Sequence, residues 1–258
     1  MNLFVGHKMD STAYSRLIFY FSKDDPDRAI SAFKMLLENG VQLDSIAFKT
    51  ACQICVKGHD AKSILGFFGT MINNKKLEMT RGIMGTFAES LFLLEAMDEL
   101  WEIYTKSTSM FEFEVLGSRL FSYTLALLID RKDYERAESV YRALRNRGHL
   151  MVFSEEMGLM IKLFLDQNKF ADLTTELESV LKLPWSIVLP ITNYMLKHRN
   201  AMPDLLREST EKWERIGTLK QPLLEKEETY MRMDEEETSV FKIYLQSCVK
   251  FFSAQTNQ

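Results

Sequence analysis

Five sets of largely apolar residues recur along this chain at one spacing and at nearly constant intervals. Within each set the residues stand at positions i, i+3, i+4 and i+7, which share one face of an α-helix. The first residues of successive sets are 34, 36, 37 and 36 positions apart. The sets are Tyr14, Leu17, Ile18, Phe21; Phe48, Ala51, Cys52, Cys55; Met84, Phe87, Ala88, Leu91; Phe121, Thr124, Leu125, Leu128; and Met157, Met160, Ile161, Phe164. A period near 35 residues in an all-helical pattern predicts stacked helical hairpins, which usually form binding surfaces.

A second apolar helix is expected after each of these first helices. Its buried residues should be Ala29, Phe33, Leu36, Leu37; Ile64, Phe67, Phe68, Met71; Met97, Leu100, Trp101, Tyr104; Ala137, Val140, Tyr141, Leu144; and Leu173, Leu177, Val180, Leu181. Gly40 and Gly148 predict helix ends in the left-handed conformation. Serines three residues before the first anchor predict N-caps at Ser11, Ser45, Ser118 and Ser154; for Ser118 the alternative is a helix that begins earlier, near Phe113. Because one hairpin cannot cover both of its apolar faces, the repeats are expected to stack.

The expected fold class is therefore all-α, with one α-solenoid of helix-turn-helix repeats and a C-terminal capping helix. Beyond the fifth repeat the period weakens, and a run of glutamates precedes a last amphipathic helix. That helix either caps the array or docks on a partner. The predicted divisions are five repeats over 11–183, a degenerate sixth hairpin or cap over 184–217, an acidic linker over 218–237 and an amphipathic helix over 238–253.

The bulk composition limits the classes of function. With 258 residues and 46% hydrophobic content, the chain can bury a large core. Its formal net charge of −4 counts against indiscriminate binding to polyanions. Three cysteines, an odd number, indicate reduced thiols rather than a disulfide framework. The first eleven residues contain no secretory segment and are too short and too poor in arginine for a transit peptide, so we expect a cytosolic protein or a mature or trimmed form.

Local strings in the first and fourth repeats resemble pentatricopeptide repeats. In the first repeat an aromatic residue is followed by a small polar one, Tyr14-Ser15, and the repeat ends Gly40-Val41-Gln42-Leu43-Asp44. The fourth repeat contains the similar string Asp133-Tyr134-Glu135-Arg136-Ala137. Residues 45–180, with the string Gln53-Ile54-Cys55-Val56-Lys57, resemble short-array mitochondrial members of this family in animals. The resemblance implies a mitochondrial matrix location, mitochondrial RNA as the partner, and a role in processing, stabilising or translating transcripts.

In this family, bases are recognised by the residue after the first anchor and by the last residue of the repeat. The corresponding pairs here are Ser15 with Asp44, Lys49 with Thr80, Gly85 with Gly117, Ser122 with Phe153, and Gly158 with Ile187. The first pair resembles a purine-recognising pair, and the resemblance implies RNA contacts for Ser15, Asp44, Lys49 and Ser122. Glycine and isoleucine side chains cannot hydrogen-bond a base edge. Any RNA contact should therefore be short or should depend on the shape of the RNA.

A group of basic residues in the fourth repeat has two interpretations. The group consists of Arg119, Arg131, Lys132, Arg136, Arg142, Arg145 and Arg147. It is either a patch that contacts phosphates or a solvated helix face with i, i+4 ion pairs such as Glu138 with Arg142. The first interpretation adds Arg142, Arg145 and Arg147 to the candidate RNA-binding residues.

Few residues in this sequence have the spacing of catalytic or metal-binding motifs. Cys52 and Cys55, with His59 one turn on, have the spacing of metal ligands, but both are first-helix anchors and are expected in the core. Nucleotide-binding loops, nucleophile elbows and zinc-hydrolase motifs are absent. We therefore expect no enzyme, cofactor, metal, membrane span or small-molecule substrate. The alternative function is a protein-interaction scaffold or a subunit of a larger ribonucleoprotein assembly, which the acidic balance and the amphipathic C-terminal helix favour.

Overall fold

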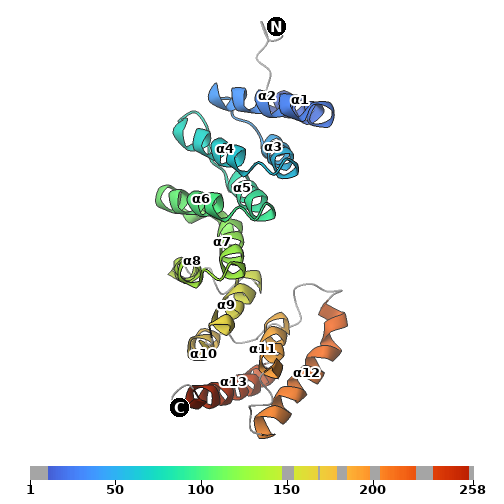
Figure 1. The fold of residues 1–258 in the computed structure, drawn as a ribbon, viewed down its shortest axis with the longest axis vertical. Coiled ribbons are helices and arrows are strands. Elements are labelled where there is room, and N and C mark those ends of the chain that lie inside the picture. Colours follow the sequence, from blue (N-terminus) through green and yellow to red (C-terminus); the bar gives the residue numbers. More distant parts are fainter. Residues whose placement is uncertain are drawn as a thin grey trace. The chain divides into compact units, whose positions relative to one another are not determined.

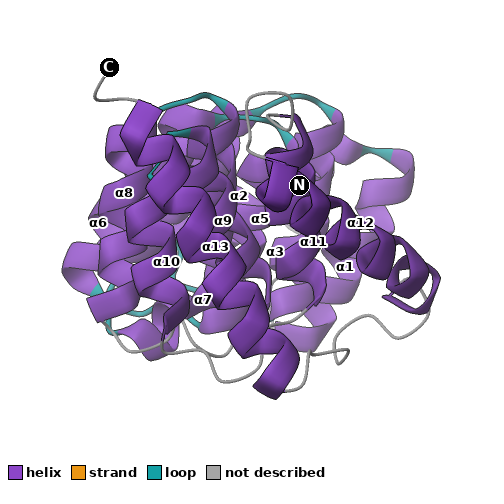
Figure 2. Cartoon of the chain, turned by 90° about the horizontal axis from the view of Figure 1, so that it is seen from below, coloured by secondary structure: helices purple, strands orange, loops and turns teal. Residues whose placement is uncertain are grey.

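The computed structural model describes residues 11–146, 154–167, 169–178, 185–197, 204–224 and 235–255. Within these ranges the chain consists of α-helices and their connections, and strands are absent (Figure 2). The predicted all-α class is therefore confirmed. The chain divides into two compact units, one ending at Arg131 and the other beginning at Lys132.

The first unit is a two-layered stack of helical hairpins (Figure 1). Its helices are α1 (Ser11–Asp24), α2 (Pro26–Glu38), α3 (Ser45–Lys57), α4 (Ala61–Asn73), α5 (Arg81–Leu93), α6 (Met97–Met110) and α7 (Phe113–Asp130). The first helices of the repeats, α1, α3, α5 and α7, pack on one another in order. The second helices, α2, α4 and α6, form the other layer in the same order. This is the predicted solenoid arrangement.

Hydrogen bonds at helix ends fix where these helices begin and stop. The side chains of Asp25, Asp60 and Thr80 each accept a backbone N–H three residues on, which caps α2, α4 and α5. The predicted glycine end is also confirmed at Gly40, where φ is +72°. There the Gly40 N–H donates to Leu37 O and the next N–H donates to Leu36 O, both at 2.9 Å, which closes α2.

Two of the predicted serine caps are wrong. Helix α3 is capped by Asp44, whose carboxylate accepts the Ala47 N–H at 2.9 Å, and Ser45 is the first helical residue. Ser118 lies inside α7, which begins at Phe113, the alternative start, and is kinked at Gly117. At the start of α3 the adjacent Asp44, not Ser45, reaches the Ala47 N–H. In α7 the backbone of Gly117, with φ 67° and ψ 163°, bends the helix one residue before Ser118.

The core of the first unit follows the predicted spacing in most places, but the prediction is wrong for Met97 and Trp101 of α6, which are only half-buried, while Ile103 of the same helix is buried. All anchor residues of α3, α5 and α7 are buried. Phenylalanine rings connect the first three repeats through edge-to-face contacts, with Phe33 lying 5.0 Å from Phe48 and 4.8 Å from Phe67 between ring centroids. Phe87 continues this cluster through Phe48 and Phe68. Such contacts stabilise beyond the area they bury, so the cluster joins both helix layers into one core.

The second unit packs a further series of helices. They are α8 (Tyr134–Asn146), α9 (Ser154–Asp166), α10 (Phe170–Glu178), α11 (Trp185–Lys197), α12 (Asp204–Leu224) and α13 (Glu235–Gln255). Helix α13 packs against α10 and α12. The Phe241 ring contacts Trp213 at 5.1 Å, and the Tyr244 hydroxyl lies 2.8 Å from Thr210 Oγ1. The C-terminal helix thus covers neighbouring helices, as a capping helix does.

Helices occupy both ends of the range 218–237 that the charge pattern assigns to an acidic linker. Helix α12 extends to Leu224 and α13 begins at Glu235, while residues 225–234 lie outside the described part. Glutamate is a good helix former, so an acidic run by itself does not end a helix. No helix in the described ranges has the length and apolar character needed to cross a membrane.

Candidate nucleic-acid interface

The first-helix layer brings together the pair that most resembles a base-recognition site. The Ser15 hydroxyl lies 2.7 Å from Asp44 Oδ1 and 2.9 Å from the carbonyl oxygen of Ser11. Asp44 Oδ1 also accepts the Ala47 N–H, so capping and pairing use the same carboxylate oxygen. Ser15 is buried, whereas Asp44 is partly exposed. The pair is therefore held in place, with Asp44 Oδ2 left to accept a further hydrogen bond.

The next predicted residues on this layer differ in accessibility. Lys49 is exposed on α3, at the position that Ser15 occupies on α1. Its predicted companion Thr80 caps α5, with its hydroxyl oxygen 3.3 Å from the Ile83 backbone nitrogen. Ser122 on α7 is only 8% exposed, and its hydroxyl donates to the Ser118 carbonyl at 3.0 Å. Lys49 thus presents its charge to solvent, while Ser122 is turned back to its own helix.

Two arginines cover the third predicted pair, in which both residues are glycines. A Cβ placed on Gly117 would lie 2.9 Å from both Cγ and Nε of Arg81. A Cβ placed on Gly85 would lie 3.3 Å from Cδ of Arg119. Arg81 of α5 therefore crosses over a glycine of α7, and Arg119 of α7 crosses over a glycine of α5. We call this arrangement the crossed arginine pair.

The crossed arginine pair lines a hollow on the first-helix layer. Its volume is about 370 Å³, and its lining residues are Arg81, Gly82, Leu116, Gly117, Ser118 and Arg119. The lining contains no carboxylate. Glu89 approaches Arg119 at 3.7 Å, in a pair whose side chains are 44% and 68% exposed. The hollow is thus positively charged and open to solvent.

Sequence reasoning did not assign Arg81 to the site and placed Arg119 only in the basic group of the fourth repeat. The missing information is tertiary, because each arginine is positioned by a glycine of the neighbouring repeat. The available signal was the Gly85 and Gly117 pair itself, where the absence of side chains leaves room for others. Phe153 lies outside the described residues, and Gly158 and Ile187 belong to the second unit.

The basic residues of α8 are engaged in ion pairs. Arg142 lies 3.4 Å from Glu138, and Arg145 lies 2.5 Å from Glu176 of α10. Lys169 also pairs with Glu138. The predicted pairing of Glu138 with Arg142 is therefore confirmed, and both arginines belong to the second unit. Arg147 lies outside the described residues, and the RNA contacts of this group stay predictions.

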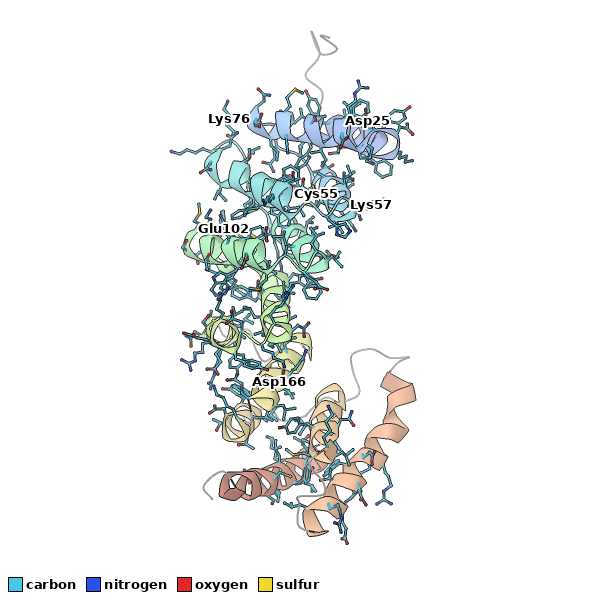
Figure 3. All side chains as sticks on the ribbon, in the orientation of Figure 1. Asp25, Cys55, Lys57, Lys76, Glu102 and Asp166 are labelled. Atoms are coloured by element: carbon cyan, nitrogen blue, oxygen red, sulfur yellow. The ribbon has the colours of Figure 1, made fainter. Side chains whose placement is uncertain are left out.

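The two cysteines with the spacing of metal ligands lie on the buried face of α3. Cys52 and Cys55 are buried, and Cys55 lies toward the interior while Lys57 points away from it (Figure 3). Burial, together with the nearby negative charge of Asp60, raises the pKa of the Cys55 thiol to about 11. Burial and the neighbouring Cys55 raise the pKa of the Cys52 thiol further. The core interpretation of these cysteines is confirmed.

We expect the thiols to be unreactive in the folded protein at neutral pH. Burial raises the pKa of Cys248 to about 11 as well, and the thiolate is the reacting form. Titration with a chromogenic disulfide reagent should therefore detect almost no thiol before denaturant is added and all three afterwards. Rapid reaction of a cysteine in the native protein would contradict this placement.

Comparisons with known proteins find similarity at the level of structure. The crystal structure of nuclear proteinaceous RNase P 2 from A. thaliana is similar to this chain with a TM-score of 0.49 and 14% sequence identity, over 69% of this chain and 40% of that one. The crystal structure of the pentatricopeptide repeat protein PPR10 from maize has a TM-score of 0.40 and 13% identity, over 82% of this chain and 33% of that one. No family model and no curated sequence matches this chain.

A pentatricopeptide repeat protein is thus among the structures found. This chain spans well under half the length of either structure. Likenesses this distant transfer neither a function nor site residues. The repeat fold and the candidate interface rest on the geometry of this chain, with its two helix layers, the Ser15–Asp44 pair and the crossed arginine pair.

Proposed function

We propose that this protein binds single-stranded RNA with the first-helix layer of its first unit and acts without catalysis. The observation that carries the proposal is the hydrogen bond between Ser15 and Asp44 at 2.7 Å. It unites the residue after the first anchor with the last residue of the same repeat. The buried hydroxyl fixes the carboxylate, whose Oδ2 can accept a hydrogen bond from the donor of a base edge.

The neighbouring charges support the same surface. Lys49 is exposed on α3, and the crossed arginine pair follows between α5 and α7. Cationic side chains along a strand neutralise phosphates, which supplies most of the affinity of nucleic-acid binding. Single-stranded RNA is the favoured form because its base edges are accessible to side chains. The overall charge of −4 counts against indiscriminate polyanion binding, so the proposed contact is confined to these cationic residues.

The cellular role follows from the sequence resemblance. Residues 45–180 resemble pentatricopeptide repeat domain-containing protein 2 of animal mitochondria. The role proposed on that basis is processing, stabilisation or translation of transcripts in the mitochondrial matrix, with a cytoplasmic location as the alternative.

Replacing Asp44 with asparagine should weaken binding to purine-containing single-stranded RNA several-fold, as measured by fluorescence anisotropy. Asparagine still caps α3, so helix α3 is retained while the charged acceptor is lost. The matched control is Asp60→Asn, because Asp60 caps α4 with the same type of bond to the Ser63 N–H. A wild-type protein that binds no RNA, or equal effects of the two substitutions, would refute the proposal.

An interaction scaffold is the second candidate, and one apolar hollow favours it. Tyr14, Leu17 and Phe21 of α1 are only half-buried, whereas their counterparts in α3, α5 and α7 are all buried. With α2 these residues line a largely apolar hollow of about 660 Å³. In later repeats the corresponding face receives the preceding hairpin, so a helical hairpin of a partner protein is the occupant that fits this geometry.

A further inference from the structure

We propose that the crossed arginine pair is a phosphate clamp that holds one backbone phosphodiester of single-stranded RNA. This inference rests on the proposed function and adds a site to it. The clamp consists of Arg81 of α5 and Arg119 of α7. The clamp lies where the base-recognition positions of the pentatricopeptide pattern are both glycine, Gly85 and Gly117. This repeat therefore holds the RNA strand by the RNA backbone and does not recognise a base.

The first support is positional. Each arginine side chain lies over a glycine of the adjacent first helix, with the contacts of 2.9 Å at Gly117 and 3.3 Å at Gly85 measured to a hypothetical Cβ. A side chain at either glycine would displace the arginine above it. The two stems are therefore positioned by backbone surfaces, which reduces the side-chain entropy lost when a ligand binds.

The second support is electrostatic. Two guanidinium groups line one hollow without a carboxylate in its lining. Arg119 forms an ion pair with Glu89 at 3.7 Å, in which both side chains are exposed, and exposed pairs of this kind contribute little energy. A phosphate oxygen pair matches the planar donors of an arginine better than a single distant carboxylate does. Arg119 is therefore expected to give up its ion pair with Glu89 in favour of an RNA phosphate.

The third support is the direction of the neighbouring helix. Arg81 is the first residue of α5, and Gly82 also lines the hollow. The N-terminal end of a helix carries partial positive charge and exposes backbone N–H groups. Together with two guanidinium groups, this end of α5 favours an anion.

An RNA strand is the favoured source of the phosphate because the hollow belongs to the same helix layer as the Ser15–Asp44 pair. Helices α1, α3, α5 and α7 pack in sequence, so the Ser15–Asp44 pair of the first repeat and the clamp of the third repeat lie on one helix layer, with the second repeat and its exposed Lys49 between them. A strand that places a base against the pair continues toward the clamp with its backbone.

The test compares two double variants with the same change in net charge. Arg81→Gln with Arg119→Gln removes the clamp, and Lys62→Gln with Lys106→Gln removes two exposed cations from α4 and α6 of the other layer. Binding of a fluorescent single-stranded RNA is measured over a series of salt concentrations. Loss of one phosphate contact should lower the slope of log K against log salt by about 0.7 for the clamp variant alone. Its affinity should fall roughly tenfold at low salt, the size expected for a charge-assisted bidentate contact.

Each outcome decides the proposal. Wild-type protein that binds no RNA refutes both the function and the clamp. RNA binding that is weakened by Asp44→Asn, but with equal salt slopes for the two double variants, refutes the clamp and leaves the function standing. A clamp variant that keeps its RNA affinity but loses a phosphoserine peptide shows a protein ligand, which also refutes it. All four arginine and lysine side chains are exposed, and matched unfolding midpoints exclude misfolding as the cause.

Discussion

Replacing Phe33 with alanine is expected to lower the free energy of unfolding of the first unit by about 3–5 kcal/mol. Phe33 has no exposed surface, and its ring contacts those of Phe48 and Phe67 at 5.0 and 4.8 Å. Alanine leaves a cavity where both helix layers meet, and a close-packed core collapses only partly around it. Urea unfolding followed by circular dichroism measures the change.

The matched control for this substitution is Met35→Ala on the same helix. Met35 is 49% exposed, and alanine has the better helix propensity. Its replacement should change the free energy of unfolding by less than about 1 kcal/mol. Equal losses for the two variants would mean that the phenylalanine cluster does not form the core of the first unit.

Replacing Gly117 with alanine should lower the stability of the same unit by about 1–3 kcal/mol. Gly117 has φ 67° and ψ 163°, a region that residues with a Cβ avoid. The new Cβ would also meet Arg81 at 2.9 Å, although a flexible side chain can shift. Most of the loss should therefore come from the backbone, either as strain or as a straightened α7.

Gly69→Ala is the control for this change. Gly69 lies inside α4, and a Cβ there would meet nothing within 4 Å. Alanine should raise stability by about 0.5–1 kcal/mol, because it restricts the unfolded chain more than glycine does. Thermal and urea unfolding of both variants measure the two opposite shifts. A Gly117→Ala variant as stable as wild type would show that the kink imposes no strain.

Helix spacing predicted the core because burial on a helix face follows directly from the period of 3.6 residues. Ile18, Phe48 and Phe87 are buried as this spacing requires. The half-exposure of Tyr14 could not be predicted in this way. An anchor is buried only if a neighbour covers it, and periodicity does not show which anchors have such a neighbour.

Local chemistry predicted helix ends less well. Ser45 and Asp44 are adjacent, and both residue types cap helices, so the sequence alone did not decide between them. The structure selects Asp44, which reaches the Ala47 N–H and also holds Ser15. The kink at Gly117 was missed because the apolar pattern continues through it on both sides.

The candidate site was predicted only where its partners follow from the repeat length. Ser15 and Asp44 were paired by their positions in one repeat, and they meet in the structure. The pair between Arg145 and Glu176 joins α8 to α10, and the spacing of charges on one helix does not show such a partner. The crossed arginine pair likewise depends on two glycines of different helices.

The shared oxygen of Asp44 ties ligand contact to the integrity of a helix. One atom, Oδ1, holds both the start of α3 and the hydroxyl of α1. A ligand that draws this carboxylate toward itself loosens the first turn of α3, whereas one that uses Oδ2 leaves that turn protected. Under the proposed function, fraying at Ala47 would therefore report which oxygen of Asp44 an RNA base engages.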